Sequence, residues 1–207
     1  MFSSLVFLLA LTSIVGASPI APRQSLSTTR NDIIDGVCRE VTIIFARGTT
    51  ETGNVGSLAG PPFFNALVAD LSSTQVAVQG VDYPADVAGF LAGGSSAGAS
   101  TMAGHVKTIK SSCPTTKIVL SGYSQGAQVT HKAAALLSTA EAAMVSSIVL
   151  FGDPNDGDAF PGTLNNHVKT FCHTGDLICA GTAIILAPHL TYSVDASDAA
   201  EFVVSNL

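Results

Sequence analysis

The residues best suited to covalent chemistry lie between Lys117 and Val129, where the chain reads KIVLSGYSQGAQV. Gly122, Ser124 and Gly126 form a G-x-S-x-G pattern after a short apolar run and before an alanine-rich helical stretch. This order is typical of a nucleophile elbow, in which glycines let strand and helix approach closely around a serine. The helix start also offers free backbone N–H groups to developing negative charge. Ser124 is therefore the predicted nucleophile.

A serine nucleophile needs a histidine base, which in hydrolases with such an elbow follows the serine and an acid in the chain. Of the five histidines, His105 and His131 fall within predicted helices, on faces that we expect to be exposed. His167 and His173 flank a predicted strand and leave little room for an acid before them. His189 follows the last predicted strand and is the predicted base.

Two aspartates compete for the role of the acid that orients this histidine. Asp153 ends the strand predicted beside the elbow strand, but Pro154 follows it, so it suits a turn equally well. Asp176 lies in a short loop between Cys172 and Cys179, and closing that loop would restrict the carboxylate. We favour Asp176 and keep Asp153 as the alternative.

The four cysteines predict two disulfides, since an even number is typical of secreted chains. Three pairings are possible, and we favour Cys38–Cys113 with Cys172–Cys179. Six residues separate Cys172 from Cys179, more than the two to four of a zinc knuckle, so we expect no metal.

The first thirty residues differ in character from the rest. Residues 1–17 contain an uncharged apolar run and end in small residues, which predicts a secretory signal peptide. Residues 18–30 are polar with two prolines and predict a disordered spacer or pro-segment. Residues 31–207 then form a single catalytic domain. We expect a secreted, extracellular monomer with no stable membrane insertion, and the net charge of −6 argues against nucleic-acid binding.

Short apolar runs alternate with helical patterns through residues 31–207. Helices are predicted from the prolines at 61–62, across 99–112, from 125 to about 138, and in the tail at 198–204. Strands are predicted at 41–45, 76–81, 118–120, 147–151 and 168–172. Such alternation predicts a mainly parallel sheet with helices on both faces, whose strand ends gather the candidate residues at one edge.

Three segments resemble fungal cutinases, a family of small secreted serine esterases: ARGTTETGN (46–54), GYSQGAQ (122–128) and CHTGDLICAGTAIILAPHLTY (172–192). The resemblance extends from about Cys38 to Phe202. It implies a lidless α/β-hydrolase with five parallel strands, and it assigns Ser124, Asp176 and His189 as nucleophile, acid and base.

The resemblance also implies an oxyanion hole from the backbone N–H groups of Thr49 and Gln125, with the Thr49 hydroxyl assisting. Many family members have Ser where this chain has Thr49. The implied activity is hydrolysis of cutin-like polyesters and short-chain esters without a cofactor. Acetylxylan esterases share much of the pattern, so an acetylxylan-type esterase is the alternative activity. A third hypothesis is a non-catalytic surface-binding protein, which the intact Ser, Asp and His disfavour.

Two loops are expected to flank the serine and rim an apolar cleft. Residues 84–99 match no motif that we can place, and family loops at this position border the substrate cleft. The residues that we expect at the rim are aliphatic or aromatic: Phe90, Leu91, Ile184, Ile185 and Leu186.

Overall fold

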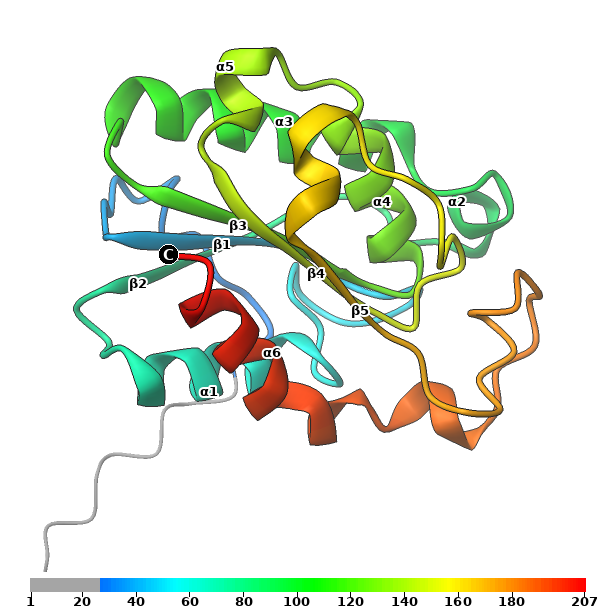
Figure 1. The fold of residues 1–207 in the computed structure, drawn as a ribbon. Coiled ribbons are helices and arrows are strands. Elements are labelled where there is room, and N and C mark those ends of the chain that lie inside the picture. The colour runs from blue at the N-terminus through cyan, green and yellow to red at the C-terminus, as the bar shows by residue number, and fades with distance from the viewer. Residues whose placement is uncertain (1–26) are drawn as a thin grey trace, which may run out of the picture.

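Five parallel strands form the central sheet, in the order β2-β1-β3-β4-β5 (Figure 1). The computed structural model describes residues 27–207. Its strands are β1 (Val41–Ala46), β2 (Val76–Gly80), β3 (Lys117–Tyr123), β4 (Val145–Phe151) and β5 (Val168–Phe171). All five predicted strands are confirmed, and the elbow strand continues three residues beyond its apolar run, to Tyr123.

Both faces of the sheet are buried because its strands carry apolar side chains in both directions. In β1, Ile43 and Phe45 pack into the core on one face, and Ile44 and Ala46 pack into the core on the other. This alternation follows from the two-residue period of a strand, and a near-continuous apolar run is expected where helices cover both faces.

Helices form a layer on each side of the sheet (Figure 1). One layer contains α1 (Gly60–Asp70) and α6 (Ala196–Val204), which pack against each other. The other contains α3 (Ser96–Ser112), α4 (Gln125–Ala134) and the short α5 (Thr139–Ala142). The remaining connections hold α2 (Val87–Leu91) and the 3₁₀ turns η1 (Gly162–His167), η2 (Ala187–Leu190) and η3 (Tyr192–Asp195).

The predicted helix from 125 to 138 is too long. Helix α4 ends at Ala134, and a separate helix, α5, begins after Ser138. Ser138 and Glu141 form a reciprocal capping box, in which each side chain bonds the other residue's backbone N–H. A serine in this role has an extended backbone and starts a new helix, so the first helix cannot continue through it.

Serine and aspartate caps also explain the helical structure in the segment that matched no motif. Helix α3 begins at Ser96, three residues before the predicted apolar stripe, because the Ser95 hydroxyl accepts the Gly98 N–H bond. Helix α2 was not predicted, and the Asp86 carboxylate caps it by accepting from Gly89 N–H at 2.7 Å.

The last residues of the predicted spacer bond to the domain. Thr28 O accepts bonds from Asn54 N and Val55 N, and Arg30 O accepts from Gly80 N. Residues 28–30 are therefore fixed to the domain by backbone hydrogen bonds. The predicted signal peptide and the spacer from 18 to 26 lie outside the described residues.

Two disulfides join the four cysteines as predicted, Cys38 to Cys113 and Cys172 to Cys179. The first ties the segment before β1 to the end of α3, and the second closes a short loop after β5. Among residues 27–207, none of the helices has the length and apolar character needed to cross a bilayer.

Candidate active site

The elbow between β3 and α4 holds Ser124 in a backbone conformation that a serine rarely adopts, with φ 56° and ψ −119°. The glycines on either side are required by packing. A Cβ atom on Gly122 would lie 2.2 Å from Gly126 O, and one on Gly126 would lie 1.9 Å from Ala46 O. Strand and helix therefore approach too closely for any other residue, which is the physical reason for the G-x-S-x-G pattern.

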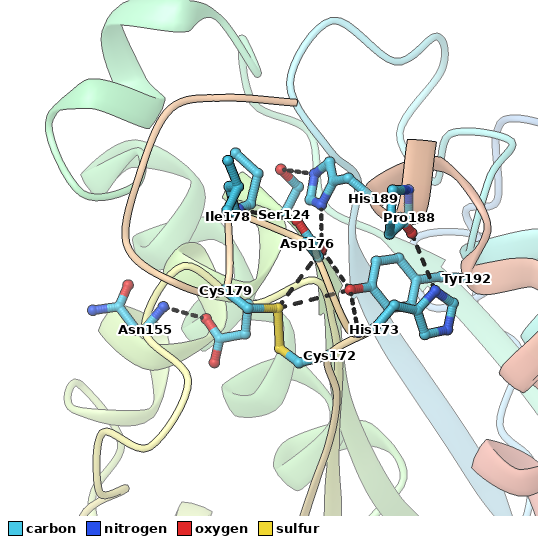
Figure 2. The surroundings of a disulfide bond; sticks show 12 residues. Ser124, Asn155, Cys172, His173, Asp176, Ile178, Cys179, Pro188, His189 and Tyr192 are labelled. Atoms are coloured by element: carbon cyan, nitrogen blue, oxygen red, sulfur yellow. Dashed lines mark hydrogen bonds and ion pairs between the residues drawn. A yellow bond between two sulfur atoms is a disulfide. The ribbon is translucent and has the colours of Figure 1, made fainter. Parts of the chain in front are cut away.

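Ser124, His189 and Asp176 lie in one hydrogen-bonded line (Figure 2). Ser124 Oγ is 3.0 Å from His189 Nε2, and His189 Nδ1 is 2.8 Å from Asp176 Oδ2. All three are buried, with residue exposures of 5% or less. Because an ionised carboxylate only accepts, His189 Nδ1 donates to Asp176 and Nε2 is free to accept the serine proton. This is the arrangement in which a histidine acts as a general base.

Asp176 is held as a carboxylate by donors on both oxygens. Oδ1 accepts from Ile178 N–H at 3.0 Å, and Oδ2 accepts from the Tyr192 hydroxyl at 2.5 Å as well as from His189. Burial by itself would raise the pKa of this carboxyl. The bonds from Tyr192, His189 and Ile178 outweigh burial and hold the pKa below its usual value. Asp176 is therefore ionised at neutral pH.

His189 lies in η2 and is fixed by the residue that precedes the nucleophile. The Tyr123 hydroxyl donates to His189 O at 2.8 Å, and the two rings stack with centroids 5.0 Å apart. Burial raises the pKa of the Tyr123 hydroxyl, so it stays a donor at neutral pH. His189 is thus held by a bond to its backbone carbonyl, by stacking on one face of its ring and by the bond from its Nδ1 atom.

The alternative acid, Asp153, belongs to a second and separate histidine–aspartate pair. Its Oδ2 atom lies 2.8 Å from His131 Nε2, and the His131 ring stacks on Phe160 at 4.1 Å. The prediction of an exposed face was therefore wrong for His131, whose side chain is 14% exposed. His105 is half-buried in α3, and burial lowers its pKa. His173, also set aside, bonds Asp195.

Thr49 and Gln125 meet beside Ser124. The Gln125 side-chain amide donates to Thr49 Oγ1 at 2.9 Å and to Asp86 O at 2.7 Å. Since Thr49 Oγ1 accepts this bond, its own proton is free to point elsewhere. Within residues 27–207, neither the Thr49 nor the Gln125 backbone N–H bonds a protein acceptor, as expected for a loop and for the first residue of a helix.

The loop that carries Thr49 is fixed by a buried arginine and a glutamate. Arg47 donates to Glu51 O at 2.8 Å and to Tyr83 O at 2.8 Å. The Glu51 carboxylate accepts from Gly48 N–H at 2.8 Å and from two further backbone N–H groups, those of Ser57 and Leu58. A loop bonded at so many points needs little reorganisation when charge develops beside it.

A small apolar cavity of about 140 Å³ opens beside Ser124. It is bounded by α2 and by the segment after the short disulfide loop; its lining residues are Thr49, Val87, Phe90, Leu91, Ser124, Ile178, Ala183 and Ile185. Of the predicted rim residues, Leu91, Ile184, Ile185 and Leu186 are exposed, at 44–69%. These four side chains are therefore outside the core, and Leu91 and Ile185 also line the cavity.

The two tyrosines that contact the line of Ser124, His189 and Asp176 were not predicted from the sequence. Tyr192 lies inside the quoted segment 172–192, three residues after His189, but nothing in its spacing indicates a bond to an aspartate. Tyr123 occupies the variable position before the serine in the elbow pattern. The sequence indicates only that a tyrosine hydroxyl, if buried, needs a hydrogen-bond partner. It does not identify the partner of Tyr123 or of Tyr192.

Comparison with known proteins adds an independent line of evidence. The Cutinase family profile matches residues 37–207. A curated cutinase of Botryotinia fuckeliana is 50% identical over 184 residues, covering 89% of this chain and 91% of that protein. A solved Trichoderma reesei cutinase, in complex with a phosphonate inhibitor, is 47% identical with a TM-score of 0.79, covering 87% of this chain and 80% of that one.

Similarity to acetylxylan esterases is confined to the fold. The catalytic core of an acetyl xylan esterase from the same fungus, Trichoderma reesei, is 19% identical with a TM-score of 0.63. It covers 82% of this chain and all of its own length. The α/β-hydrolase fold is thus shared by both groups, whereas the sequence identity to this chain is much lower for the acetyl xylan esterase. This chain belongs to the cutinase family.

Proposed function

We propose that this protein is a secreted carboxylic-ester hydrolase that cleaves cutin-like polyesters and short-chain esters through an acyl-enzyme. The observation that carries this proposal is the buried line from Ser124 Oγ to His189 at 3.0 Å and from His189 to Asp176 at 2.8 Å, beside an apolar cavity. Ser124 is the nucleophile, His189 the general base and Asp176 the residue that orients it.

In the first half-reaction, His189 Nε2 takes the proton of Ser124 Oγ as this oxygen attacks the ester carbonyl carbon. The carbonyl oxygen becomes negatively charged, and the backbone N–H groups of Thr49 and Gln125 donate to it together with the Thr49 hydroxyl. Because Gln125 already donates to Thr49 Oγ1, the hydroxyl proton is available for this oxygen. His189 then returns its proton to the departing alcohol, which leaves an acyl group on Ser124.

The second half-reaction reverses these roles with water in place of the alcohol. His189 takes a proton from water, the hydroxide attacks the acyl carbon, and the proton passes to Ser124 Oγ as the acid leaves. Asp176 stays ionised throughout and stabilises the imidazolium that forms in each half. Every step uses only the protein's own side chains, its backbone N–H groups and water.

Substrate class is inferred from the cavity and its surroundings. Apolar side chains surround Ser124, and the exposed aliphatic rim continues that surface outward. Such walls suit an aliphatic acyl chain better than a polar sugar backbone. Similarity to curated cutinases near 50% identity supports the same choice. The acetylxylan-type activity remains the second candidate because that fold is shared.

We also propose how the chain is processed, where it acts and that it acts alone. Residues 1–17 are proposed as a cleaved signal peptide, with the following residues as a short spacer before a single catalytic domain. The two disulfides support an extracellular location, since such bonds persist in oxidising compartments. We propose that the enzyme acts as a monomer.

The experiment that tests this function measures two products side by side. Purified protein is incubated with plant cutin and with acetylated xylan, and released hydroxy fatty acids and acetate are quantified against a Ser124→Ala control. The proposal predicts fatty-acid release that the control lacks. Acetate release alone would support the acetylxylan alternative, and no Ser124-dependent release of either would support the non-catalytic scaffold.

A further inference from the structure

Tyr192 is a buried hydroxyl group that the mechanism above does not use. Its side chain is 1% exposed. The hydroxyl lies 2.5 Å from Asp176 Oδ2, the same oxygen that accepts the His189 Nδ1–H bond at 2.8 Å (Figure 2). One carboxylate oxygen is therefore shared between the general base and a phenol.

The direction of the phenol bond follows from its neighbours. The Tyr192 oxygen accepts a bond from His173 N–H at 3.2 Å, so its single proton must go elsewhere. Cys179 Sγ lies 3.7 Å from both this oxygen and Asp176 Oδ2, but a disulfide sulfur has no proton to give. The remaining partner is the carboxylate, which only accepts. Tyr192 therefore donates to Asp176.

The ring of Tyr192 is held by two histidine rings, so its hydroxyl has little freedom to leave the carboxylate. The His173 ring stacks on it with centroids 4.3 Å apart, and His173 in turn bonds Asp195 Oδ2 at 2.7 Å. The His189 ring also meets it edge to face, with centroids 6.0 Å apart and an angle of 87° between the planes. A side chain held in this way can fix the oxygen that it bonds.

We propose that Tyr192 is a positioning residue of the reaction, whose hydroxyl holds Asp176 Oδ2 in line with His189 Nδ1 and limits the negative charge that this oxygen presents to the imidazole. This inference rests on the proposed function of Ser124, His189 and Asp176. It adds a fourth side chain to their line and gives it two separable effects, one on geometry and one on charge.

The charge effect has a definite sign. Burial works to raise the pKa of the Asp176 carboxyl, and the Tyr192 bond is the largest of the contributions that lower it. Removing the hydroxyl makes the carboxylate more basic, so it stabilises protonated His189 more strongly. Only neutral His189 can accept the serine proton, so the acid limb of kcat/KM moves to higher pH when the hydroxyl is lost.

The test uses Tyr192→Phe with Tyr123→Phe as its matched control. Both variants remove one buried phenol hydroxyl beside His189, but Tyr123 donates to a backbone carbonyl and not to the carboxylate. We expect Tyr192→Phe to lower kcat roughly tenfold to a hundredfold, as expected for losing a bond to a charged group. We expect its acid limb to rise by about 0.5–1 pH unit. KM should change little. Whatever its effect on kcat, Tyr123→Phe should leave the acid limb in place.

A double-mutant cycle shows whether Tyr192 acts through Asp176. If it does, adding Tyr192→Phe to Asp176→Asn should cost less than about twofold, because residues that act as a unit are not additive. An equal cost in both backgrounds, or an unmoved acid limb in Tyr192→Phe, would overturn the proposal and leave Tyr192 a packing residue.

Replacement of Tyr192 by 3-fluorotyrosine provides a test that keeps the hydroxyl in place. The more acidic phenol donates a stronger bond, so the acid limb should move to lower pH, opposite to the phenylalanine variant. A shift upward or no shift contradicts the proposal, even if Tyr192→Phe fails to fold. Wild-type activity that Ser124→Ala abolishes shows that the proposed function holds whatever Tyr192 does.

Discussion

Asp176→Asn and Asp153→Asn form a matched pair, because each aspartate is buried and each bonds a histidine at 2.8 Å. Only the Asp176 pair includes the histidine that contacts Ser124. The two substitutions should therefore destabilise the protein to a similar degree and differ sharply in their effect on catalysis.

The stability cost can be worked from the bonds that are lost. A hydrogen bond to a charged group contributes about 1.5–3 kcal/mol. For a domain of this size each kcal/mol corresponds to about 2–4 °C in melting temperature. Both variants should thus melt about 3–12 °C below the wild type. Asp176→Asn should fall at the upper end, because one amide cannot accept from all of the donors that now bond the carboxylate, those of Ile178, Tyr192 and His189.

The catalytic cost differs because Asp176 fixes the tautomer and charge balance of His189. In serine hydrolases the loss of this carboxylate lowers kcat by roughly 10⁴-fold, and we expect a loss of that order for Asp176→Asn. Asp153→Asn should stay within about tenfold of wild type, since Asp153 bonds His131 whereas His189 is the histidine that bonds Ser124. The assay is hydrolysis of p-nitrophenyl butyrate at a temperature where thermal melts show both variants folded. A larger loss in Asp153→Asn than in Asp176→Asn would refute the assignment.

Three further predictions address the loop, the rim and the tyrosines. Replacing Cys172 and Cys179 with Ser should lower kcat even where the variant is fully folded, because it frees the loop that carries Asp176; an unchanged kcat would show that the loop holds its shape alone. Replacing Ile184 and Leu186 with Ser should weaken hydrolysis of long-chain esters with a melting temperature within about 2 °C of wild type, since both side chains are exposed; a loss of several kcal/mol would instead place them in the core. Burial raises the pKa of all three tyrosines of the chain, Tyr83, Tyr123 and Tyr192. The stability that their neutral forms provide is therefore complete below the unfolded pKa near 10 and declines as the pH rises beyond it. Phenolate absorbance should appear together with alkaline unfolding, and tyrosine ionisation in a folded protein near pH 10 would contradict this.

The strands and the three residues of the Ser-His-Asp line were predictable because their signals are local. An apolar run, two glycines around a serine and a late histidine are each visible within a few residues of sequence. The choice of Asp176 over Asp153 relied on one further local feature, the pair of cysteines around it. In the structure Asp176 bonds His189 and Asp153 bonds His131.

The supporting bonds were not predictable because they join distant residues. Gln125 and Thr49, which bond each other, are 76 positions apart in the sequence. Asp153 and His131 are 22 positions apart, and their bond explains why the prediction of an exposed face for His131 was wrong. The predicted end of the helix that begins at Gln125 was wrong for a different reason. The capping box of Ser138 and Glu141 is present in the sequence as S-x-x-E, but the alanine-rich run around it predicts one continuous helix.

Covalent labelling of Ser124 tests the central claim most directly. An organophosphorus ester that mimics the tetrahedral intermediate is incubated with the wild type, with Asp176→Asn and with Ser124→Ala, and the adducts are counted and located by peptide mass spectrometry. We predict one adduct per wild-type molecule, on Ser124, with loss of p-nitrophenyl butyrate hydrolysis in proportion to labelling. Asp176→Asn should label far more slowly, and Ser124→Ala should neither label nor hydrolyse the ester. An adduct on another residue that abolishes activity, or a folded Ser124→Ala protein within tenfold of wild-type activity, would contradict the assignment of Ser124 as the nucleophile.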